Sequence, residues 1–267
     1  MPEGPEVRRM AEDLGESICG KKLVDVKIVS GRYTKKPIDN LDIYLNKIPD
    51  RVFAVGVHGK FMYILMDSGC SIWSTLGMTG NWSSFEKKHS RIVLEFENWK
   101  SYFNDIRNFG TFKICLNRNS LVEKLGSLGP DMLAEDVSDD LFIQRFRKKQ
   151  KWNICKAMMN QSVVSGIGNY IKAESLWLSE ISPNKLVSDL SDSDLKRLND
   201  CTKQIMRASY DSGGATFLTH KNFSGKPGDY SSRFLCYNRK FDAEGNKILK
   251  SKTPDGRTTY WSPNKQR

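Results

Sequence analysis

The chain has 267 residues and carries 42 Lys and Arg against 31 Asp and Glu, a formal net charge of +11. With 39% hydrophobic residues it can bury the core of one or two domains, which excludes disorder and a collagen-like fibre. No apolar run is long enough to cross a bilayer, and the acidic start Met-Pro-Glu-Gly-Pro-Glu is unlike a secretory signal. We expect a soluble intracellular protein, nuclear or cytoplasmic, with a polyanionic partner.

The N-terminal half predicts one helix followed by a β-rich region. Apolar residues recur at helical spacing from Val7 to Ile18, and the helix should end at Gly20. Short runs rich in Val, Ile, Tyr and Phe follow at 23–29, 52–57, 61–66, 71–74, 92–96 and 112–116. Turn residues separate these runs, and the series is typical of an antiparallel sandwich or barrel.

The C-terminal half changes character after the break at 128–131. Residues 138–212 have helical periodicity, and Ser191 with Asp194 fits a capping box at a helix start. After Gly213-Gly214 the tail predicts a hairpin, with a turn at 242–246 between strands at 235–241 and 247–250.

Charge is concentrated in this tail. From His220 onward there are 11 basic and four acidic residues, a net of +7, with aromatic residues interleaved. This composition favours a surface that lies on a phosphate backbone. A second basic run at 145–151 is interpreted either as part of that surface or as a solvated face. The six cysteines form no Cys-x-x-Cys pair, and we interpret them as reduced, partly buried side chains.

The start of the chain predicts a nucleophile. A small second residue permits removal of Met1, which would leave the secondary amine of Pro2 as the chain end. An α-amino group has a pKa of about 7.7–8.0, so roughly a tenth of it is unprotonated at neutral pH. Its adduct with an aldehyde carbon is an iminium, which eases elimination beta to it, and Glu3 and Glu6 could move protons. Alternatively, these residues open and cap a helix.

A glycine-rich turn lies between two apolar helical stretches, at Gly166-Ile167-Gly168-Asn169. Glycines at this place would let the backbone N–H groups and the Asn169 side chain reach an anion at the N-terminus of the second helix. With DNA as the partner, that anion is a phosphate. A plain connection between helices explains the turn about as well.

Taken in order, these features resemble the formamidopyrimidine-DNA glycosylase and endonuclease VIII family, base-excision enzymes with a helix-two-turn-helix. The resemblance runs along the whole chain, and seven motifs in one order are far more specific than any one of them. The motifs are 1–7, Gly59-Lys60, Leu76-Gly77-Met78-Thr79-Gly80, 104–110, 128–130, 166–169 and 256–261.

The resemblance assigns the catalytic residues. It implies that Pro2 attacks C1′ of the damaged nucleotide and that Glu3 is its partner in proton transfer. It further implies that Glu6 helps to organise the site, and that Lys60 grips a phosphate beside the lesion.

The resemblance also assigns residues that hold the DNA. It implies that Asn169 and Arg257 bind phosphates around the extruded nucleotide. Arg257 is also expected to be one of the catalytic residues. Met78 and Phe109 match residues that stack into the gap left by base flipping, while Arg107 addresses the base opposite. Without the family context, Met78 and Phe109 would be interpreted as ordinary loop and core residues.

The C-terminus departs from the family pattern. Many members end in a zinc finger with two Cys-x-x-Cys pairs, but Ser262 and Lys265 take the places of the last pair and 241–248 lacks cysteine. The resemblance therefore implies a zincless finger that presents Arg257 without a metal or other cofactor. Since a two-stranded hairpin is weakly stable alone, it should be held by packing on the helical domain. The side chains expected to pack are Tyr237, Ile248, Tyr260 and Trp261.

The predicted fold is thus α+β and multidomain. Residues 1–130 should form a catalytic antiparallel β-sandwich domain with flanking helices, and 131–137 a linker. Residues 138–219 should form the helix-two-turn-helix domain, and 220–267 the zincless β-hairpin finger.

The resemblance implies a bifunctional DNA glycosylase and AP lyase that removes oxidised bases through a Pro2 iminium and β,δ-elimination. The start of the chain and the Tyr-Trp-x-Pro at 260–263 resemble the endonuclease VIII branch, which favours oxidised pyrimidines and also accepts formamidopyrimidines and hydantoins. The loop at 221–230 instead resembles the formamidopyrimidine branch, with oxidised purines as substrates. Thr75 stands where the family usually has His.

The expected partner is duplex DNA with oxidised bases or abasic sites, bound by a monomer, and single-stranded DNA is left open as a second partner. Two other function classes are weighed. One is a non-catalytic module that binds damaged DNA, which retention of Met1 would favour. The other is an N-terminal-proline tautomerase, which would need neither the basic tail nor the wedge residues.

Overall fold

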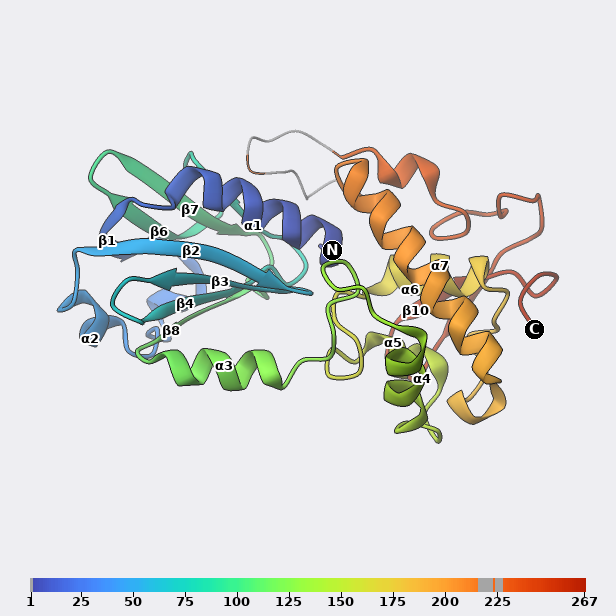
Figure 1. The fold of residues 1–267 in the computed structure, drawn as a ribbon. Coiled ribbons are helices and arrows are strands. Elements are labelled where there is room, and N and C mark those ends of the chain that lie inside the picture. The colour runs from blue at the N-terminus through green and yellow to red at the C-terminus, as the bar shows by residue number, and fades with distance from the viewer. Residues whose placement is uncertain (1, 216–222, 224–227) are drawn as a thin grey trace. The chain divides into compact units, whose positions relative to one another are not determined.

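The computed structural model describes residues 2–215, 223 and 228–267, and its contacts divide the chain into two compact units (Figure 1). Unit 1 comprises 1–2, 6–126 and 213–228, and unit 2 comprises 3–5, 127–212 and 229–267. The predicted domains place 3–5 and 127–130 with the sandwich and 213–219 with the helices. They also make 131–137 a separate linker and assign 220–228 to the finger, whereas the contacts place these ranges in unit 2 and unit 1. The loop expected at 221–230 lies largely outside the described residues, as does Met1.

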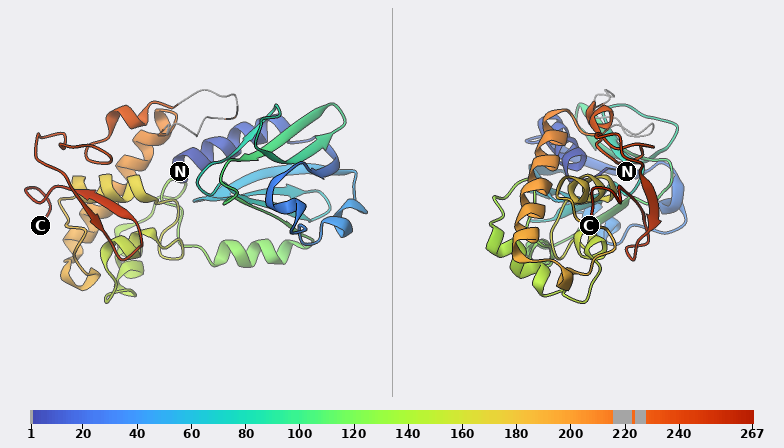
Figure 2. Two further views of the ribbon diagram at one scale, coloured as in Figure 1. Left: turned by 180° about the vertical axis from the view of Figure 1, so that it is seen from behind. Right: turned by 90° about the vertical axis from the view of Figure 1, so that its right-hand side faces the viewer.

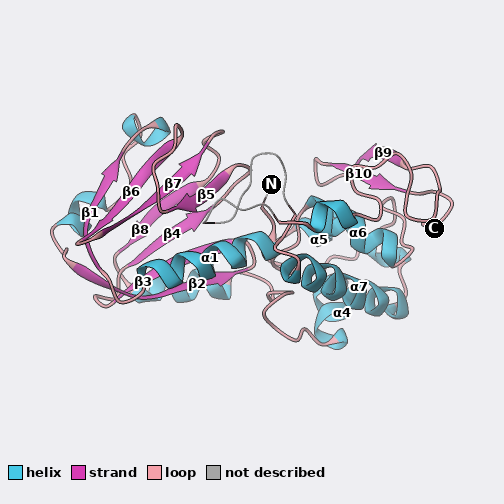
Figure 3. Ribbon diagram, turned by 90° about the horizontal axis from the view of Figure 1, so that it is seen from above, coloured by secondary structure: helices cyan, strands magenta, loops and turns pink. Residues whose placement is uncertain are grey.

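Unit 1 is built on an antiparallel sheet, and Figure 3 shows that most strands belong to this unit. In the described part of the chain the sheet has eight strands in the order β5-β7-β6-β1-β2-β3-β4-β8. The strands are β1 Lys22–Ile28, β2 Asp50–His58, β3 Phe61–Met66, β4 Ser71–Thr75, β5 Gly80–Ser83, β6 Ser90–Phe96, β7 Trp99–Asp105 and β8 Thr111–Cys115. The antiparallel β-domain is confirmed, although β5 and β7 were not predicted.

Helix α1, Gly4–Ile18, covers the core of unit 1 with the apolar face that its spacing predicted. Val7, Met10 and Leu14 are buried in one cluster with side chains from both ends of the sheet, including Trp82. Burying such a face stabilises the unit by about 25 cal/mol per Å² of apolar surface. The smaller elements are α2 Leu41–Leu45, α3 Arg118–Gly126 and the 3₁₀ turn η1 Gly31–Thr34.

Unit 2 is mainly helical. Its elements are α4 Asp139–Arg147, α5 Ile154–Met159, α6 Asn169–Leu178, α7 Asp192–Asp211 and the 3₁₀ turns η2 Val187–Asp189 and η3 Tyr230–Arg233. Side chains cap the first turns: Ser138 begins α4, Asn153 begins α5, and Ser191 with Asp194 forms the predicted capping box of α7. The helical character of 138–212 is confirmed.

The hairpin of unit 2 lies later in the chain than predicted. Strands β9 Leu249–Lys252 and β10 Thr258–Trp261 pair antiparallel, so the turn falls at 253–257 and not at 242–246. At the predicted place the structure has a single bridge from Phe241 to Lys247. Figure 2 shows the hairpin in red beside α6, with which β10 is in contact. Tyr237, Ile248 and Tyr260 pack with Ala173 and Trp177, as expected, but Trp261 is not part of that cluster.

The cysteines are free thiols, as predicted: Cys19 is exposed and the other five are buried. Among the described helices, none has both the length and the apolar character that crossing a bilayer requires.

Candidate active site and nucleic-acid interface

The carboxylate of Glu3 closes the N-terminus of α6. Its Oε1 accepts a hydrogen bond from the Tyr170 N–H at 2.9 Å, and its Oε2 accepts one from the Ile171 N–H at 3.2 Å. Glu3 is 2% exposed. The first N–H groups of a helix have no partner within it and carry partial positive charge, so they stabilise a carboxylate there. The anion at this helix end in the structure is therefore a side chain of the protein, whereas the sequence suggested a phosphate.

The glycine-rich turn makes room for this contact. A Cβ on Gly168 would lie 2.1 Å from Cδ of Glu3, and a Cβ on Gly4 would lie 3.0 Å from Cα of Gly166. The Gly4 N–H donates to the Gly166 carbonyl at 2.9 Å. Gln161, which the sequence did not single out, accepts from the Gly166 N–H at 3.1 Å and donates to the Ile167 carbonyl at 3.1 Å. The turn thus positions the acid that follows Pro2.

Glu6 holds a different segment, within unit 1. Its Oε1 accepts from the Ala215 N–H at 2.7 Å, and Glu6 is 3% exposed. Gly214 has a φ of +87°, and a Cβ there would lie 2.9 Å from Cγ of Glu6. Since L side chains rarely adopt that conformation, glycine suits this position on both grounds. Pro2, also in unit 1, is buried.

Two loops of unit 1 bring Met78, Arg107 and Phe109 together. Gly77 has a φ of +56°, and a Cβ there would lie 2.7 Å from the carbonyl carbon of Phe109. The Arg107 guanidinium stacks on the Phe109 ring, 4.7 Å from its centroid. Phe109 is 54% exposed and Met78 is half-buried. An exposed phenylalanine under an arginine is available to stack on another aromatic surface.

Asp105 ties these loops to each other, a role that the sequence analysis missed. It is 1% exposed. Its Oδ1 accepts from the Thr79 hydroxyl at 2.5 Å and from the Arg107 N–H at 3.2 Å, and its Oδ2 accepts from the Gly110 N–H at 2.6 Å. Arg32 adds hydrogen bonds to the carbonyls of Asn108 and Gly110, at 3.2 and 2.5 Å. Asp105 is the last residue of β7, a strand that was not predicted, and its signal in the sequence was its place in the motif at 104–110.

Lys60 and Thr75 are placed by unit 1 as well. Lys60 follows Gly59, whose φ is +58°, in the tight turn between β2 and β3. Thr75 ends β4 and shares a hydrogen bond of 2.7 Å with the hydroxyl of Thr111 on β8. Thr75 therefore contributes to strand pairing in this chain.

In unit 2, Asn169 contacts the hairpin that carries Arg257. Its Nδ2 donates to the Thr258 carbonyl at 3.0 Å, while its Oδ1 is buried without a partner among the described residues. Burial raises the pKa of the neighbouring Tyr237 hydroxyl, and a hydrogen bond from Asn169 opposes that rise. Arg257 is exposed, and its carbonyl accepts from the Thr253 N–H at 3.0 Å. The structure thus brings Asn169 next to the Arg257 turn.

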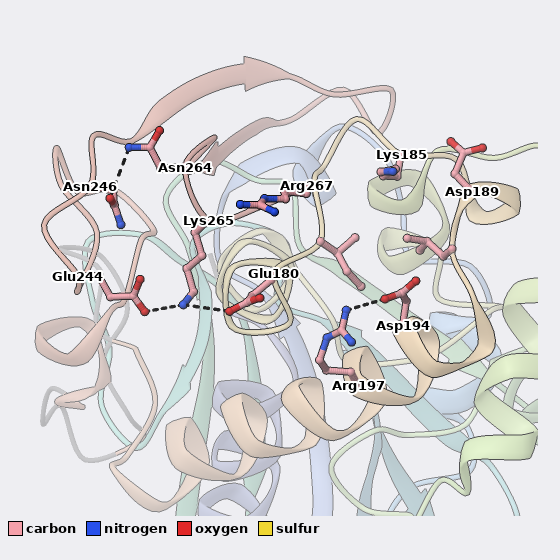
Figure 4. A pocket seen from close by; sticks show the side chains of 12 residues that line it. Glu180, Lys185, Asp189, Asp194, Arg197, Glu244, Asn246, Asn264, Lys265 and Arg267 are labelled. Carbon is pink, nitrogen blue, oxygen red and sulfur yellow. Dashed lines mark hydrogen bonds and ion pairs between the residues drawn. The ribbon is translucent and has the colours of Figure 1, made fainter.

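The residues that stand where many family members have zinc ligands, 241–248 with Ser262 and Lys265, do not fit a zinc ion. Lys265 forms ion pairs with Glu244 at 2.5 Å and Glu180 at 3.5 Å (Figure 4). The Asp242 carboxylate accepts from the Trp177 indole N–H at 3.1 Å. An ammonium group cannot ligate a metal. Over the described residues, no three His, Cys, Asp or Glu side chains gather as a metal site would require.

The predicted site residues divide between the units. Unit 1 holds Pro2, Glu6, Lys60, Met78, Arg107 and Phe109, and unit 2 holds Glu3, Asn169 and Arg257. Figure 4 shows a pocket of unit 2 whose lining, which includes Asp194, Arg197 and Arg267, contains none of them.

Comparisons with known proteins agree with this architecture. Residues 1–112 match the model of the formamidopyrimidine-DNA glycosylase N-terminal domain, and 128–221 match that of the formamidopyrimidine-DNA glycosylase H2TH domain. The formamidopyrimidine-DNA glycosylase of Listeria monocytogenes is 30% identical over 279 residues, covering 100% of both chains.

Two solved structures share the fold. The MutM (Fpg) protein of Thermus thermophilus has a TM-score of 0.88 at 24% identity, covering 99% of this chain and 98% of that one. A Lactococcus lactis Fpg mutant, solved with a Fapy-dG containing DNA, has a TM-score of 0.88 at 25% identity, with 100% of both chains covered.

The β-domain, the helix-two-turn-helix and these matches define a DNA-binding DNA glycosylase of base excision repair. The chain belongs to the formamidopyrimidine-DNA glycosylase family.

Proposed function

We propose that this chain is a bifunctional glycosylase and AP lyase in which Pro2, freed by removal of Met1, is the nucleophile. The secondary amine attacks C1′ of the damaged nucleotide, the bond from C1′ to the base breaks, and the base leaves with a proton. Opening of the sugar gives an iminium between Pro2 and C1′. Loss of a 2′ proton then drives β-elimination at C3′, and δ-elimination at C5′ leaves a one-nucleotide gap with phosphate ends. Water hydrolyses the remaining iminium, which releases the sugar remnant as an aldehyde and frees the Pro2 amine.

The observation that carries this proposal is the position of Glu3. The carboxylate directly after Pro2 is buried and held by two backbone N–H groups at 2.9 and 3.2 Å. A group fixed in this way keeps one orientation beside its neighbour in the chain, as a proton-transfer group must. We therefore assign Glu3 the transfer of protons to and from the opening sugar, and Glu6 the ordering of residues 214–215.

The DNA contacts are proposed by residue. Lys60, Asn169 and Arg257 bind phosphates around the lesion, which requires Asn169 to exchange its bond to Thr258 for one to DNA. Met78 and Phe109 fill the space left by the flipped nucleotide, and Arg107 contacts the opposite base. The exposure of Phe109 and its stacking with Arg107 support this assignment.

Formamidopyrimidines are the substrates best supported. The relatives are named formamidopyrimidine-DNA glycosylases, and one was solved with a Fapy-dG containing DNA. These names favour the oxidised-purine branch, which was the alternative, over the preference for oxidised pyrimidines expected from the start of the chain and from residues 260–263. We propose formamidopyrimidine as the substrate, since both branches of the family are expected to accept it. The experiment below decides whether oxidised purines or oxidised pyrimidines are preferred.

The test is a panel of duplexes that each carry one lesion: formamidopyrimidine, 8-oxoguanine, thymine glycol or an abasic site. We expect cleavage at formamidopyrimidine and at the abasic site, and a covalent complex when borohydride is added. The matched control is Glu3→Gln, which should give neither. A wild-type protein that binds these duplexes but cuts none would favour a non-catalytic module.

We further propose that the protein works as a monomer and without zinc. Lys265 and Asp242 take part in ion pairs and hydrogen bonds where a metal would need free ligands. Excision that is unchanged by a chelator, with no zinc found by elemental analysis, is the expected outcome. Sedimentation of the free protein should give the mass of one chain.

A further inference from the structure

A buried ion pair joins α6 to the turn of the hairpin. Lys172 Nζ lies 2.6 Å from Asp255 Oδ2, and the two side chains are 0% and 2% exposed. Lys172 is on α6, three residues after Asn169, and Asp255 is in the turn between β9 and β10. Both residues belong to unit 2.

Hydroxyl groups complete the surroundings of the pair. Asp255 Oδ1 accepts from the Thr253 hydroxyl at 2.5 Å, and this hydroxyl shares a hydrogen bond of 2.7 Å with Thr259. Thr253 is 5% exposed and Thr259 is fully buried. Burial raises the pKa of the nearby Cys155 thiol on α5 to about 11, and hydrogen bonds with Thr259 and Thr253 oppose that rise. The hairpin turn and strand β10 are therefore tied to one buried polar cluster.

A buried ion pair such as Lys172–Asp255 fixes the position of the hairpin turn on α6 more than it adds to the free energy of unfolding. Removing two charges from water costs as much as, or more than, their attraction returns. If the turn moved, however, the Lys172 ammonium would be left buried without its carboxylate, which is far more costly. Since a two-stranded hairpin alone is marginally stable, this cost confines the turn to one place on α6.

The same turn carries Arg257. The Arg257 carbonyl accepts from the Thr253 N–H at 3.0 Å and from the Thr253 hydroxyl at 3.2 Å. Asp255 and Gly256 lie between these two residues in the chain, and Gly256 has a φ of +75°. The backbone of Arg257 is thus fixed through the residue that also contacts Asp255.

We propose that Lys172 and Asp255 are positioning residues that hold the Arg257 turn for its phosphate contact. The inference rests on the proposed function, in which Arg257 binds DNA. Neither side chain of the pair touches the DNA, because both are buried; they act through Arg257. The pair links α6, which begins at Asn169, to the hairpin turn that carries Arg257. It thereby keeps the two proposed DNA contacts, Asn169 and Arg257, in a fixed arrangement.

The test measures binding to an uncleavable duplex that contains a tetrahydrofuran abasic analogue. Arg257→Ala should weaken binding about tenfold, and Lys172→Met should weaken it several-fold. If Lys172 acts through Arg257, adding Lys172→Met to Arg257→Ala causes no further loss. Losses that multiply in the double variant would overturn the inference, since Lys172 would then contribute independently.

Hydrogen exchange of the amides at 249–261 tests the pair without DNA. Lys172→Met should accelerate this exchange, whereas Lys265→Met, which removes the ion pairs to Glu244 and Glu180, should leave the exchange unchanged. Unchanged exchange in Lys172→Met would overturn the inference whatever the DNA result. If the hairpin amides of Lys172→Met exchange fast, the pair does position the turn. If Arg257→Ala then binds the duplex normally, only the proposed contact between Arg257 and a phosphate is contradicted.

An apolar double variant covers the case in which Lys172→Met does not fold. Replacing both charges, as Lys172→Met with Asp255→Leu, removes the buried unpaired group and should fold. We expect it to bind the duplex as weakly as Arg257→Ala and to exchange the hairpin amides faster. Wild-type binding and exchange in this folded variant would overturn the inference.

Discussion

Glu3 and Tyr170 lie 167 residues apart in the sequence, yet the carboxylate of Glu3 accepts a hydrogen bond from the Tyr170 N–H at 2.9 Å and so caps α6. The second oxygen accepts from Ile171. The N-terminus of α6 thus fixes the position of Glu3, the acid that follows Pro2. The glycine-rich turn before α6 leaves room for the Glu3 side chain because Gly168 has no Cβ.

Glu3→Gln should abolish catalysis at a modest cost in stability. The amide keeps one acceptor for Tyr170 but turns an NH₂ group toward the N–H of Ile171, a loss of about 1–2 kcal/mol in the free energy of unfolding. Without its proton-transfer group, excision should fall about 100-fold or more. Urea unfolding and single-turnover cleavage measure the two effects; excision at the wild-type rate would contradict the role of Glu3.

Gly168→Ala should displace the same carboxylate without touching it chemically. The new Cβ would lie 2.1 Å from Cδ of Glu3, so the side chain must leave the helix end. We expect about a tenfold or greater loss of single-turnover excision, and about 1–3 kcal/mol of stability. Gly126→Ala is the matched control, because a Cβ there has no atom within 4 Å. Equal rates for both variants would show that the position of Glu3 is unimportant.

Asp105→Ala should loosen the loops that carry Arg107 and Phe109. It leaves the Thr79 hydroxyl and the N–H groups of Arg107 and Gly110 without their acceptor, which should cost about 2–4 kcal/mol. Excision from duplex DNA should fall with it. Thr75→Val removes the exposed bond to Thr111 and should cost under about 1 kcal/mol. If Asp105→Ala unfolds at the wild-type urea concentration, these hydrogen bonds do not hold the loops.

The capping box of α7 predicts a pH dependence. Hydrogen bonds from Ser191, chiefly from its side chain, lower the pKa of Asp194 below its ordinary 3.8. Because the folded pKa is the lower one, ionised Asp194 stabilises the fold above pH 3.8, and this contribution is lost as pH falls through the folded pKa. Asp194→Asn should therefore be less stable by about 0.5–1 kcal/mol near neutral pH. A stability difference between the two proteins that does not shrink as the pH falls below 3.8 would contradict this assignment.

Elements with local signals were predictable from the sequence. The apolar face of α1 and the Ser191 cap of α7 need no distant residue to be recognised. Strand β5 has four residues including Gly80, and β7 ends in Asn104 and Asp105, so neither shows the apolar alternation of a strand. The hairpin was misplaced because its strands are rich in lysine and threonine and do not show the apolar alternation of a strand. Its turn did carry a local signal, Pro254-Asp255-Gly256, which the prediction overlooked in favour of the turn at 242–246.

The nature of the site residues was predictable, but their partners were not. Motif order pointed to Pro2, Glu3 and Arg257, yet the bonds of Glu3 to α6 and of Lys172 to Asp255 join residues far apart in sequence. No periodicity or spacing encodes such contacts, which arise when the chain is folded.

The most direct test of the central claim is mass spectrometry of the borohydride-trapped complex with formamidopyrimidine duplex. We predict that Met1 is absent from the mature protein and that the reduced sugar adduct lies on the nitrogen of Pro2. An adduct on a lysine, or no adduct in a protein whose mature N-terminus is Pro2, would contradict it.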